Sequence, residues 1–161
     1  MKFYGLILLF SAFSLVGFLK ANSYLSSLKD IKRAEFLIKN IGLCIKKENM
    51  SVGKIFEICS LECDEKTKIF LDSISPKDFG NVIFFSQKSN FCKDKTANRI
   101  LQEAFLVLGK YSAAEQLSEL EFCRKKLLNL YEKSEDSLKN KAKLFRYLGV
   151  LCGMLFVIIL I

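Results

Sequence analysis

Apolar residues gather at the two ends of the chain, and charged residues fill the stretch between them. Residues 1–19 contain one charged side chain, Lys2, and residues 147–161 contain none. A helix needs about 20 apolar residues to cross a membrane, with a lower limit of about 17. The first segment meets that limit, whereas the second is only about 22 Å long as a helix. We expect both to be transmembrane helices, the second spanning because Lys143 and Arg146 can extend their charges outward to the headgroups.

The middle stretch, 20–146, has a helical pattern almost throughout. It contains the only proline of the chain, Pro76, and no alternating strand pattern of useful length. Ser51 and Asp64 are each placed to cap a short helix. Apolar residues recur at three- and seven-residue spacing, which predicts that the first membrane helix continues to about Lys47; these residues are Leu28, Ile31, Ile38 and Ile45.

The segment 79–85 is ambiguous because it contains the β-rich run Val82-Ile83-Phe84-Phe85. It has no obvious partner strand, so we interpret 78–87 as a buried helix. The segment 94–108 predicts another helix, which ends before a capping glycine at Gly109. Its expected inward residues are Ile100, Leu101, Ala104, Phe105 and Leu108.

A capping box, Ser112-Ala-Ala-Glu115, predicts the start of a last helix that runs from about Ala113 into the membrane. Its apolar stripe packs on the same domain or on a partner helix. We therefore expect an all-α fold, with a cytoplasmic helical bundle at 20–146 between transmembrane helices at 1–19 and 147–161. The stripe consists of Leu117, Leu120, Leu127, Tyr131, Leu138, Phe145 and Leu148.

Basic residues flank both apolar segments on the side of the middle stretch. Lys20 follows the first segment, and Lys143 and Arg146 precede the second. Because Lys and Arg near a membrane segment resist translocation, these residues predict a cytoplasmic middle with both termini outside. The competing interpretation is that 1–19 is a cleaved secretory signal, with a mature amino terminus near Asn22. The residues around Lys20 lack the small-x-small pattern of a cleavage site, so we favour an uncleaved helix.

The residue types present argue against catalysis. The chain has no histidine, the commonest general base at neutral pH, and no glycine-rich phosphate loop. We therefore expect no enzyme activity, no cofactor and no small-molecule substrate. Cys59 and Cys63 share a helical face but lack the further ligands of a zinc site. The cysteines are expected to be small buried hydrophobic residues in a reducing cytosol; they are Cys44, Cys59, Cys63, Cys92, Cys123 and Cys152.

The middle stretch is basic, with 24 of the 25 Lys and Arg residues against all 17 Asp and Glu residues, a formal charge of +7. The cations are interleaved with acids and lack a grouped aromatic face, which argues against nucleic acid. They are better explained by topology and by attraction to anionic lipid headgroups. We predict that the adjacent cations Arg124, Lys125 and Lys126, with the loop around Pro76, face a cytosolic partner.

Gly149 and Gly153 form a GxxxG spacing in the last apolar segment. Such a spacing lets two helix backbones approach closely, either within one chain or between chains. Gly5 and Gly17 leave similar small surfaces on the first helix. Helix packing in the membrane is therefore expected at Gly149 and Gly153, and self-association of the chain is an open alternative.

The tail from Lys143 to Ile161 resembles the carboxyl end of the stage III sporulation protein AB family. That family ends in a basic residue followed by an uncharged SLG-x-L-x-G-hydrophobic pattern, matched here by Leu148-Gly-Val-Leu-Cys-Gly153. Further similarities are the glycines of the first helix, the helix 28–50 followed by Ser-Val-Gly-Lys-Ile-Phe, and Leu108-Gly109 ahead of Gln116. Lys110-Tyr-Ser stands where the family commonly has an aspartate.

The resemblance implies a component of the complex that links mother cell and forespore in endospore-forming bacteria. It implies an integral protein of the bacterial inner membrane, in the mother-cell-derived membrane around the forespore. The helical domain would be similar to the platform-protein domain of type II secretion and type IV pilus systems. The expected partners are other subunits of the complex, including a secretion-type ATPase that the platform would couple to the membrane channel. The alternative is a membrane-anchored regulatory coiled-coil protein that dimerises through its last helix.

Overall fold

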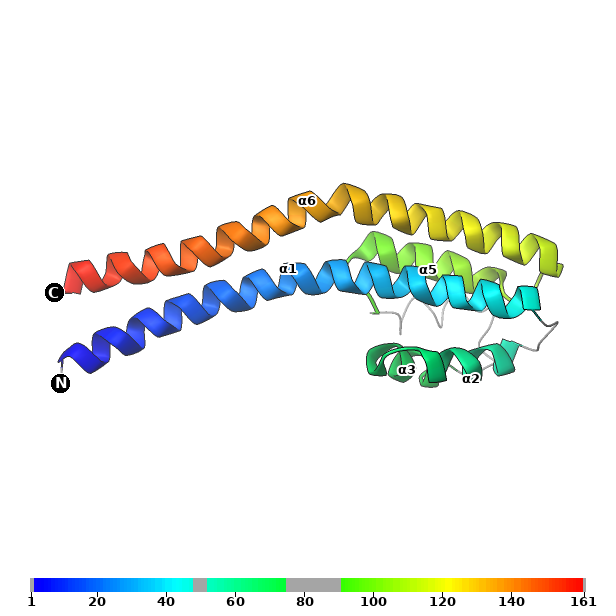
Figure 1. The fold of residues 1–161 in the computed structure, drawn as a ribbon, viewed down its shortest axis with the longest axis horizontal. Helices are drawn as coiled ribbons and strands as arrows, with labels where there is room; N and C mark the ends of the chain where they lie inside the picture. Colours follow the sequence, from blue (N-terminus) through cyan, green and yellow to red (C-terminus); the bar gives the residue numbers. More distant parts are fainter. Residues whose placement is uncertain (1, 48–51, 75–90, 161) are drawn as a thin grey trace. The chain divides into compact units, whose positions relative to one another are not determined.

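The computed structural model describes residues 2–47, 52–74 and 91–160, and within these ranges the chain forms five α-helices and no strand (Figure 1). This confirms the all-α prediction. The predicted helix at 78–87, the cap at Ser51 and the break at Pro76 lie outside the described residues. The helices are α1 (Lys2–Lys47), α2 (Val52–Glu62), α3 (Glu65–Asp72), α5 (Lys95–Val107) and α6 (Ala113–Leu160).

Two of the helices are much longer than the rest. Helix α1 has 46 residues and α6 has 48, and neither contains a proline. The predictions that the first helix continues to Lys47 and that the last begins at Ala113 are both confirmed. Each is long and apolar enough to cross a membrane, and only 11% of its most apolar 18-residue stretch is buried inside the protein. A core helix of a soluble protein would bury most of such a stretch.

The chain divides into two compact units, and each contains part of α1 and part of α6. The helix-pair unit joins the residues up to Leu28 with those from Lys133 onward, and the helical-body unit is Lys29–Glu132. The segments 20–28 and 133–146, which we assigned to the cytoplasmic domain, thus belong by compactness to the helix pair. The membrane boundaries predicted from the sequence stay a prediction.

The helical-body unit has a continuous apolar core contributed by all five helices. Phe105 of α5 is 1% exposed, with its ring centroid 5.7 Å from that of Phe56 of α2 and 6.0 Å from that of Phe70 of α3. Burying one such side chain stabilises the fold by about 1.5–3 kcal/mol. The residues predicted to face inward from 94–108 are buried, and so are three of the regularly spaced apolar residues of α1. They are Ile100, Leu101, Ala104, Phe105 and Leu108, and Ile31, Ile38 and Ile45.

Local signals set where α5 and α6 begin and end. Asp94 accepts hydrogen bonds from the backbone N–H groups of Thr96 (2.8 Å) and Ala97 (3.0 Å), which fixes the start of α5. After α5 the chain turns through Gly109, whose φ of 77° lies in the left-handed region that favours glycine. The predicted capping box is confirmed, because Ser112 N–H donates to Glu115 (3.1 Å) and Glu115 N–H donates to the Ser112 hydroxyl (3.4 Å).

Candidate functional site

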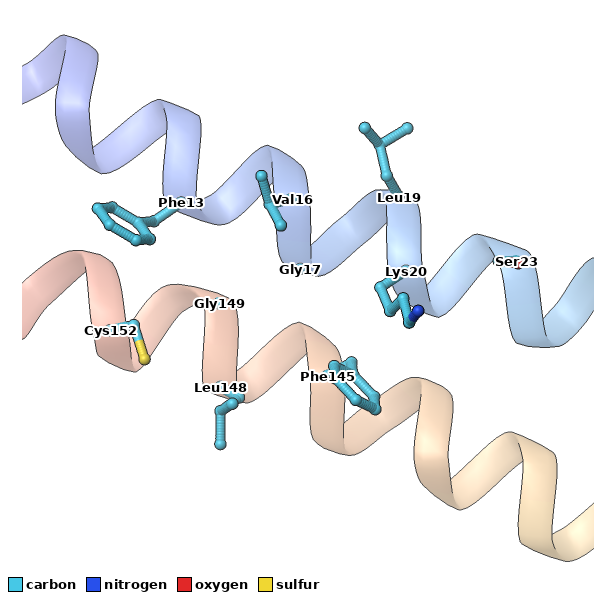
Figure 2. A pocket seen from close by; sticks show the side chains of 10 residues that line it. All are labelled: Phe13, Val16, Gly17, Leu19, Lys20, Ser23, Phe145, Leu148, Gly149 and Cys152. Atoms are coloured by element: carbon cyan, nitrogen blue, oxygen red, sulfur yellow. The ribbon is translucent and has the colours of Figure 1, made fainter.

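In the helix-pair unit, α1 and α6 meet backbone to backbone at two glycines (Figure 2). A Cβ atom on Gly17 would lie 2.7 Å from the Phe145 carbonyl oxygen and 2.9 Å from the Gly149 Cα. A Cβ atom on Gly149 would in turn lie 2.9 Å from the Gly17 Cα. Since real Cβ atoms do not approach other atoms this closely, only glycine at both positions allows the contact.

Aromatic side chains pack on both sides of the glycine contact. The Phe13 and Phe156 rings stack with their centroids 4.7 Å apart, and the Tyr24 and Phe145 ring centroids are 5.5 Å apart. A Cβ atom on Gly153 would lie 2.8 Å from the Phe10 ring. The structure thus places the two glycines of the GxxxG spacing against α1 of the same chain, whereas no atom of the described residues lies within 4 Å of a Cβ atom on Gly5. Packing of this contact inside a membrane stays a prediction.

A groove of about 560 Å³ lies beside the glycine contact (Figure 2). Of the three cations predicted to set the topology, Lys20 lines this groove. The Arg146 guanidinium lies 5.1 Å from the centre of the Phe18 ring, and Lys143 is exposed. The lining consists of Phe13, Val16, Gly17, Leu19, Lys20, Ser23, Phe145, Leu148, Gly149 and Cys152.

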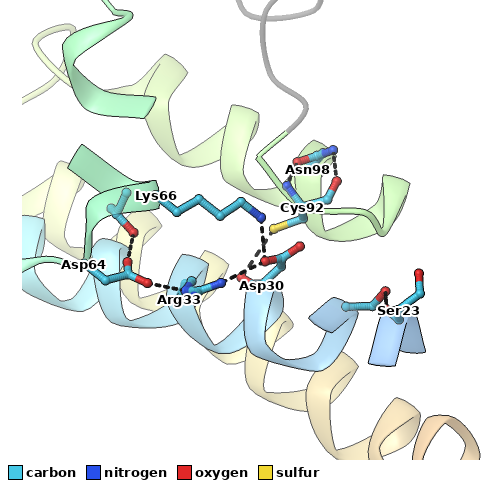
Figure 3. Close-up of polar contacts among 9 residues, drawn as sticks. Ser23, Asp30, Arg33, Asp64, Lys66, Cys92 and Asn98 are labelled. Atoms are coloured by element: carbon cyan, nitrogen blue, oxygen red, sulfur yellow. Dashed lines mark hydrogen bonds and ion pairs between the residues drawn. The ribbon is translucent and has the colours of Figure 1, made fainter. Parts of the chain in front are cut away.

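In the helical-body unit, a buried carboxylate links α1 to α3 (Figure 3). The Asp30 side chain is fully buried, and its Oδ1 atom accepts from Lys66 Nζ at 2.6 Å and from Arg33 Nη1 at 3.2 Å. The Nε atom of Arg33 also pairs with the carboxylate of Asp64, the residue before α3. One network of ion pairs therefore joins Asp30 and Arg33 of α1 to Asp64, which precedes α3, and to Lys66 of α3.

Asp64, the member of this network that directly precedes α3, has a perturbed pKa. Partial burial raises the pKa of its carboxyl, but the hydrogen bond from the Thr67 hydroxyl (2.6 Å) and the neighbouring Arg33 charge outweigh this. The net pKa of Asp64 lies below its ordinary value. The carboxylate therefore stays ionised and able to hold Arg33 in moderately acidic solution.

The same network reaches the segment before α5. The Cys92 thiol donates to the Asp30 backbone oxygen at 3.5 Å, and burial raises the pKa of this thiol to about 12. Asn98 holds the Cys92 backbone, accepting from its N–H at 2.7 Å and donating to its C=O at 2.6 Å. Asp30 Oδ2 is buried and has no hydrogen-bond partner among the described residues. This arrangement fixes α1, α3 and the start of α5 to one another.

Asp30 was not among the site residues expected from the sequence, although a signal for it exists. It lies four residues before Ala34 and seven before Leu37, both fully buried, and so shares their helical face. A charged residue on an apolar face needs a partner of opposite charge. That partner, Lys66, is 36 positions away and follows no local spacing rule.

The three predicted partner-facing cations differ in their surroundings. Arg124 Nε pairs with Glu35 Oε1 at 2.7 Å, and Lys126 Nζ pairs with Glu103 Oε2 at 2.9 Å. Hydrogen bonding to Lys126 and its charge hold the pKa of the Glu103 carboxyl below its ordinary value. Lys125 is exposed. Two of the three charges are thus engaged within the chain, Pro76 lies outside the described residues, and partner binding stays a prediction.

The cysteines are free thiols, three of them buried in the body. Burial, with the neighbouring Cys44 and Cys63 thiols, raises the pKa of Cys59 to about 12, and burial also raises the pKa of Cys63 and Cys123. Among the residues described by the structure, no three His, Cys, Asp or Glu side chains gather so as to hold a metal ion. The burial of Cys59, Cys92 and Cys123 agrees with the predicted packing role, whereas Cys44, Cys63 and Cys152 are only partly buried.

Comparison with known protein families finds a match over nearly the whole chain. The family model for stage III sporulation protein AB matches residues 2–161. No curated protein and no solved structure matches this chain.

Proposed function

Because this chain belongs to the stage III sporulation protein AB family, we propose that it is a membrane platform subunit of a secretion-like complex needed for endospore formation. The family implies a role in stage III of sporulation. The finer role is our proposal: the helical-body unit meets a cytoplasmic secretion-type ATPase, and the helix-pair unit sits in the mother-cell-derived membrane around the forespore. The family match over the whole described chain is the observation that carries it.

The distribution of apolar surface supports the membrane placement. The large apolar residues of the helix-pair unit are mostly exposed, among them Leu8, Val16, Leu151 and Ile158 at 71%, 65%, 59% and 70%. A water-soluble protein rarely exposes so continuous an apolar surface, whereas lipid tails cover it without cost. The segments 1–19 and 147–161 are the proposed spanning parts, with the helical body on the cytoplasmic side.

The construction of the helical body supports a platform role. It has its own apolar core, and its helices are joined by ion pairs between α1 and α3 and between α1 and α6. Such a body keeps its shape while a partner binds to it. Its surface carries exposed cations, of which Lys125 is the proposed contact for an acidic surface of the ATPase.

Genetic complementation tests the sporulation role. Deleting the gene should arrest sporulation at stage III, and the intact chain should restore heat-resistant spores. Lys125→Glu tests the ATPase contact, because reversing the charge should reduce co-purification of the ATPase from sporulating cells. Lys54→Glu on α2 makes the same charge change at another exposed lysine and should leave co-purification intact. Equal recovery with both variants would remove Lys125 from the proposed contact.

Thiol accessibility tests the topology. A cysteine introduced at Lys125 should be protected from an impermeant external reagent in intact cells, whereas one introduced at Lys2 should react. Labelling at Lys125 from outside would sink the proposal of a cytoplasmic body.

The alternative of a regulatory protein that dimerises through its last helix is less well supported. Gly149 and Gly153, the small residues that such a dimer would use, pack on Gly17 and Phe10 of the same chain. A two-hybrid assay of the segment 148–161 distinguishes the two ideas. The alternative requires self-association that is lost when Gly149 and Gly153 are changed to Leu, and the platform proposal does not.

A further inference from the structure

The groove of the helix-pair unit changes character along its length (Figure 2). On α1 its lining runs from Phe13 through Val16 to Lys20 and Ser23, a rise of about 15 Å. One end is therefore apolar, and the other carries the ammonium group of Lys20. The floor beside the Gly17–Gly149 contact carries no side chain.

The cationic end of the groove is far along the sequence from the acidic residues of the chain. The chain has no Asp or Glu before Asp30 and none after Asp136. Lys20 is exposed and forms no ion pair with a described acidic residue, and Arg146 faces the Phe18 ring. An exposed ammonium group at the edge of an apolar groove can attract an anion from outside the chain.

We propose that the groove binds an anionic phospholipid, with its phosphate at Lys20 and one acyl chain along the floor beside Gly17 and Gly149. The site rests on the membrane insertion proposed above. Basic pockets between membrane helices on the cytoplasmic side suit anionic headgroups, and an apolar groove suits the tail. The ligand therefore needs both parts, which a phospholipid has and a free phosphate ion lacks.

The chemistry disfavours a second copy of the chain as the occupant. The apolar segments and their flanks bring no carboxylate that could neutralise Lys20, since the acids of the helix-pair unit are Glu135 and Asp136. These precede Phe145, the first α6 residue of the groove, by nine residues or more, which is about 14 Å along the helix. A second helix pair would cover the groove but leave its charge unmatched.

The absence of tryptophan from the chain allows a direct test. Leu148→Trp places a fluorescent reporter in the groove, and Ile158→Trp places one on exposed apolar surface outside it. The full chain is reconstituted in vesicles of phosphatidylcholine and phosphatidylglycerol, with bromine atoms on the acyl chains of one lipid at a time. The quenching of the groove reporter should correspond to an affinity for phosphatidylglycerol about fivefold higher than for phosphatidylcholine. This is the effect expected of one lysine near a phosphate. The Ile158→Trp reporter should respond equally to both lipids.

A charge variant identifies the headgroup contact. Lys20→Gln in the Leu148→Trp chain should abolish the preference for phosphatidylglycerol. Lys141→Gln removes one charge from an exposed lysine outside the groove and should leave the preference unchanged. Circular dichroism should show the same helix content in all variants.

Three results would overturn the proposal. Equal quenching of the groove reporter by both lipids removes the headgroup site. Quenching of the Ile158→Trp reporter alone means that protein fills the groove. If neither reporter is quenched by either lipid, the chain is not inserted, and the proposed membrane function fails with the site.

Discussion

At the scale of single residues, Asp30 is the most consequential charge in the helical body. Its carboxylate is fully buried, while the side chains of its partners Lys66 and Arg33 are 41% and 34% exposed. Removing the carboxylate of Asp30 leaves cations that water can still solvate. Removing a cation leaves a carboxylate that water cannot reach. The two ends of the ion pair should differ in their effect on stability.

We expect Asp30→Asn to lower the free energy of unfolding of the body by about 2 kcal/mol, because it weakens two hydrogen bonds to charged groups. Lys66→Gln should cost more, about 3 kcal/mol, because it leaves the fully buried Asp30 carboxylate with Arg33 as its remaining charged partner. Thermal unfolding of the purified chain followed by circular dichroism measures both. An equal loss for the two variants would contradict the asymmetry.

Asp64 gives a pH dependence whose sign follows from its lowered pKa. A carboxyl with a lower pKa in the folded protein adds stability above its unfolded pKa of about 4 and loses it as the pH falls through the folded value. The native body should therefore lose stability below about pH 4. Arg33→Gln should make this acid limb shallower, because it removes the charge that stabilises the carboxylate. Melting curves from pH 7 to pH 2 test it, and parallel curves for both proteins would refute it.

The sequence predicts residue environments well where they depend on spacing alone. Ile31, Ile38 and Ile45 face the core as their periodicity indicates. The pairing of Arg124 with Glu35 joins residues 89 positions apart. No local rule connects them, because the pair exists only after α1 and α6 have packed. For the same reason, the sequence alone does not predict that Gly149 packs against Gly17.

At the scale of helices, the contact between α1 and α6 depends on the absence of side chains. Gly149→Leu would place a side chain on backbone atoms of α1 that cannot move away, and should separate the helices. Gly5→Leu enters open space and serves as the control. A cysteine pair at Phe13 and Phe156, which stack in the native chain, reports the contact through disulfide formation. Gly149→Leu should reduce this cross-link several-fold within the monomer band, and an unchanged yield would contradict the packing.

The start of α6 depends on its capping box. Glu115→Ala removes the acceptor of the Ser112 N–H and should lower stability by about 1 kcal/mol. Glu119→Ala, at an exposed position one turn later, should have less effect. Urea unfolding of the two variants provides the comparison, in which matching midpoints would show that the box contributes little.

The boundaries of α5 and α6 were predictable because caps are local, as at Asp94, Gly109 and Ser112. Asp64 was predicted as a cap, and it stands at the N-cap position of α3, where its side chain accepts from the Thr67 hydroxyl and makes no capping hydrogen bond to the backbone. Its carboxylate also reaches Arg33 on α1, a contact that no capping rule contains. The helices themselves could therefore be predicted from the sequence, whereas the contacts between them could not.

At the scale of the whole molecule, the proposed membrane insertion places the two compact units in different solvents, the helix pair in lipid and the helical body in water. Urea weakens burial of apolar surface from water, which holds the helical body together. It has little access to helices whose backbone is surrounded by lipid. We expect urea to remove only part of the helical signal of the chain in lipid bilayers, leaving a plateau from the helix pair. A single transition to complete loss of helix would contradict two separable units.

The division into these units was only partly visible in the sequence. Charge patterning separates the apolar ends from 20–146, but compactness separates them at Leu28 and Lys133. The residues between the two sets of boundaries are polar enough for water and still pair as helices. The hydropathy of a segment indicates the solvent that suits it, whereas the compact unit of a segment depends on which residues pack against it. The two sets of boundaries therefore need not coincide.

The buried thiols of the body report how often the native protein opens locally. Burial raises the pKa of Cys59 and Cys92 well above the ordinary value, so these thiols are protonated at neutral pH, and burial also blocks the approach of a reagent. Alkylation can then proceed only when the body opens. The rate of mass gain at these positions consequently measures how often the wild-type core is exposed, and a tightly bound partner would slow it.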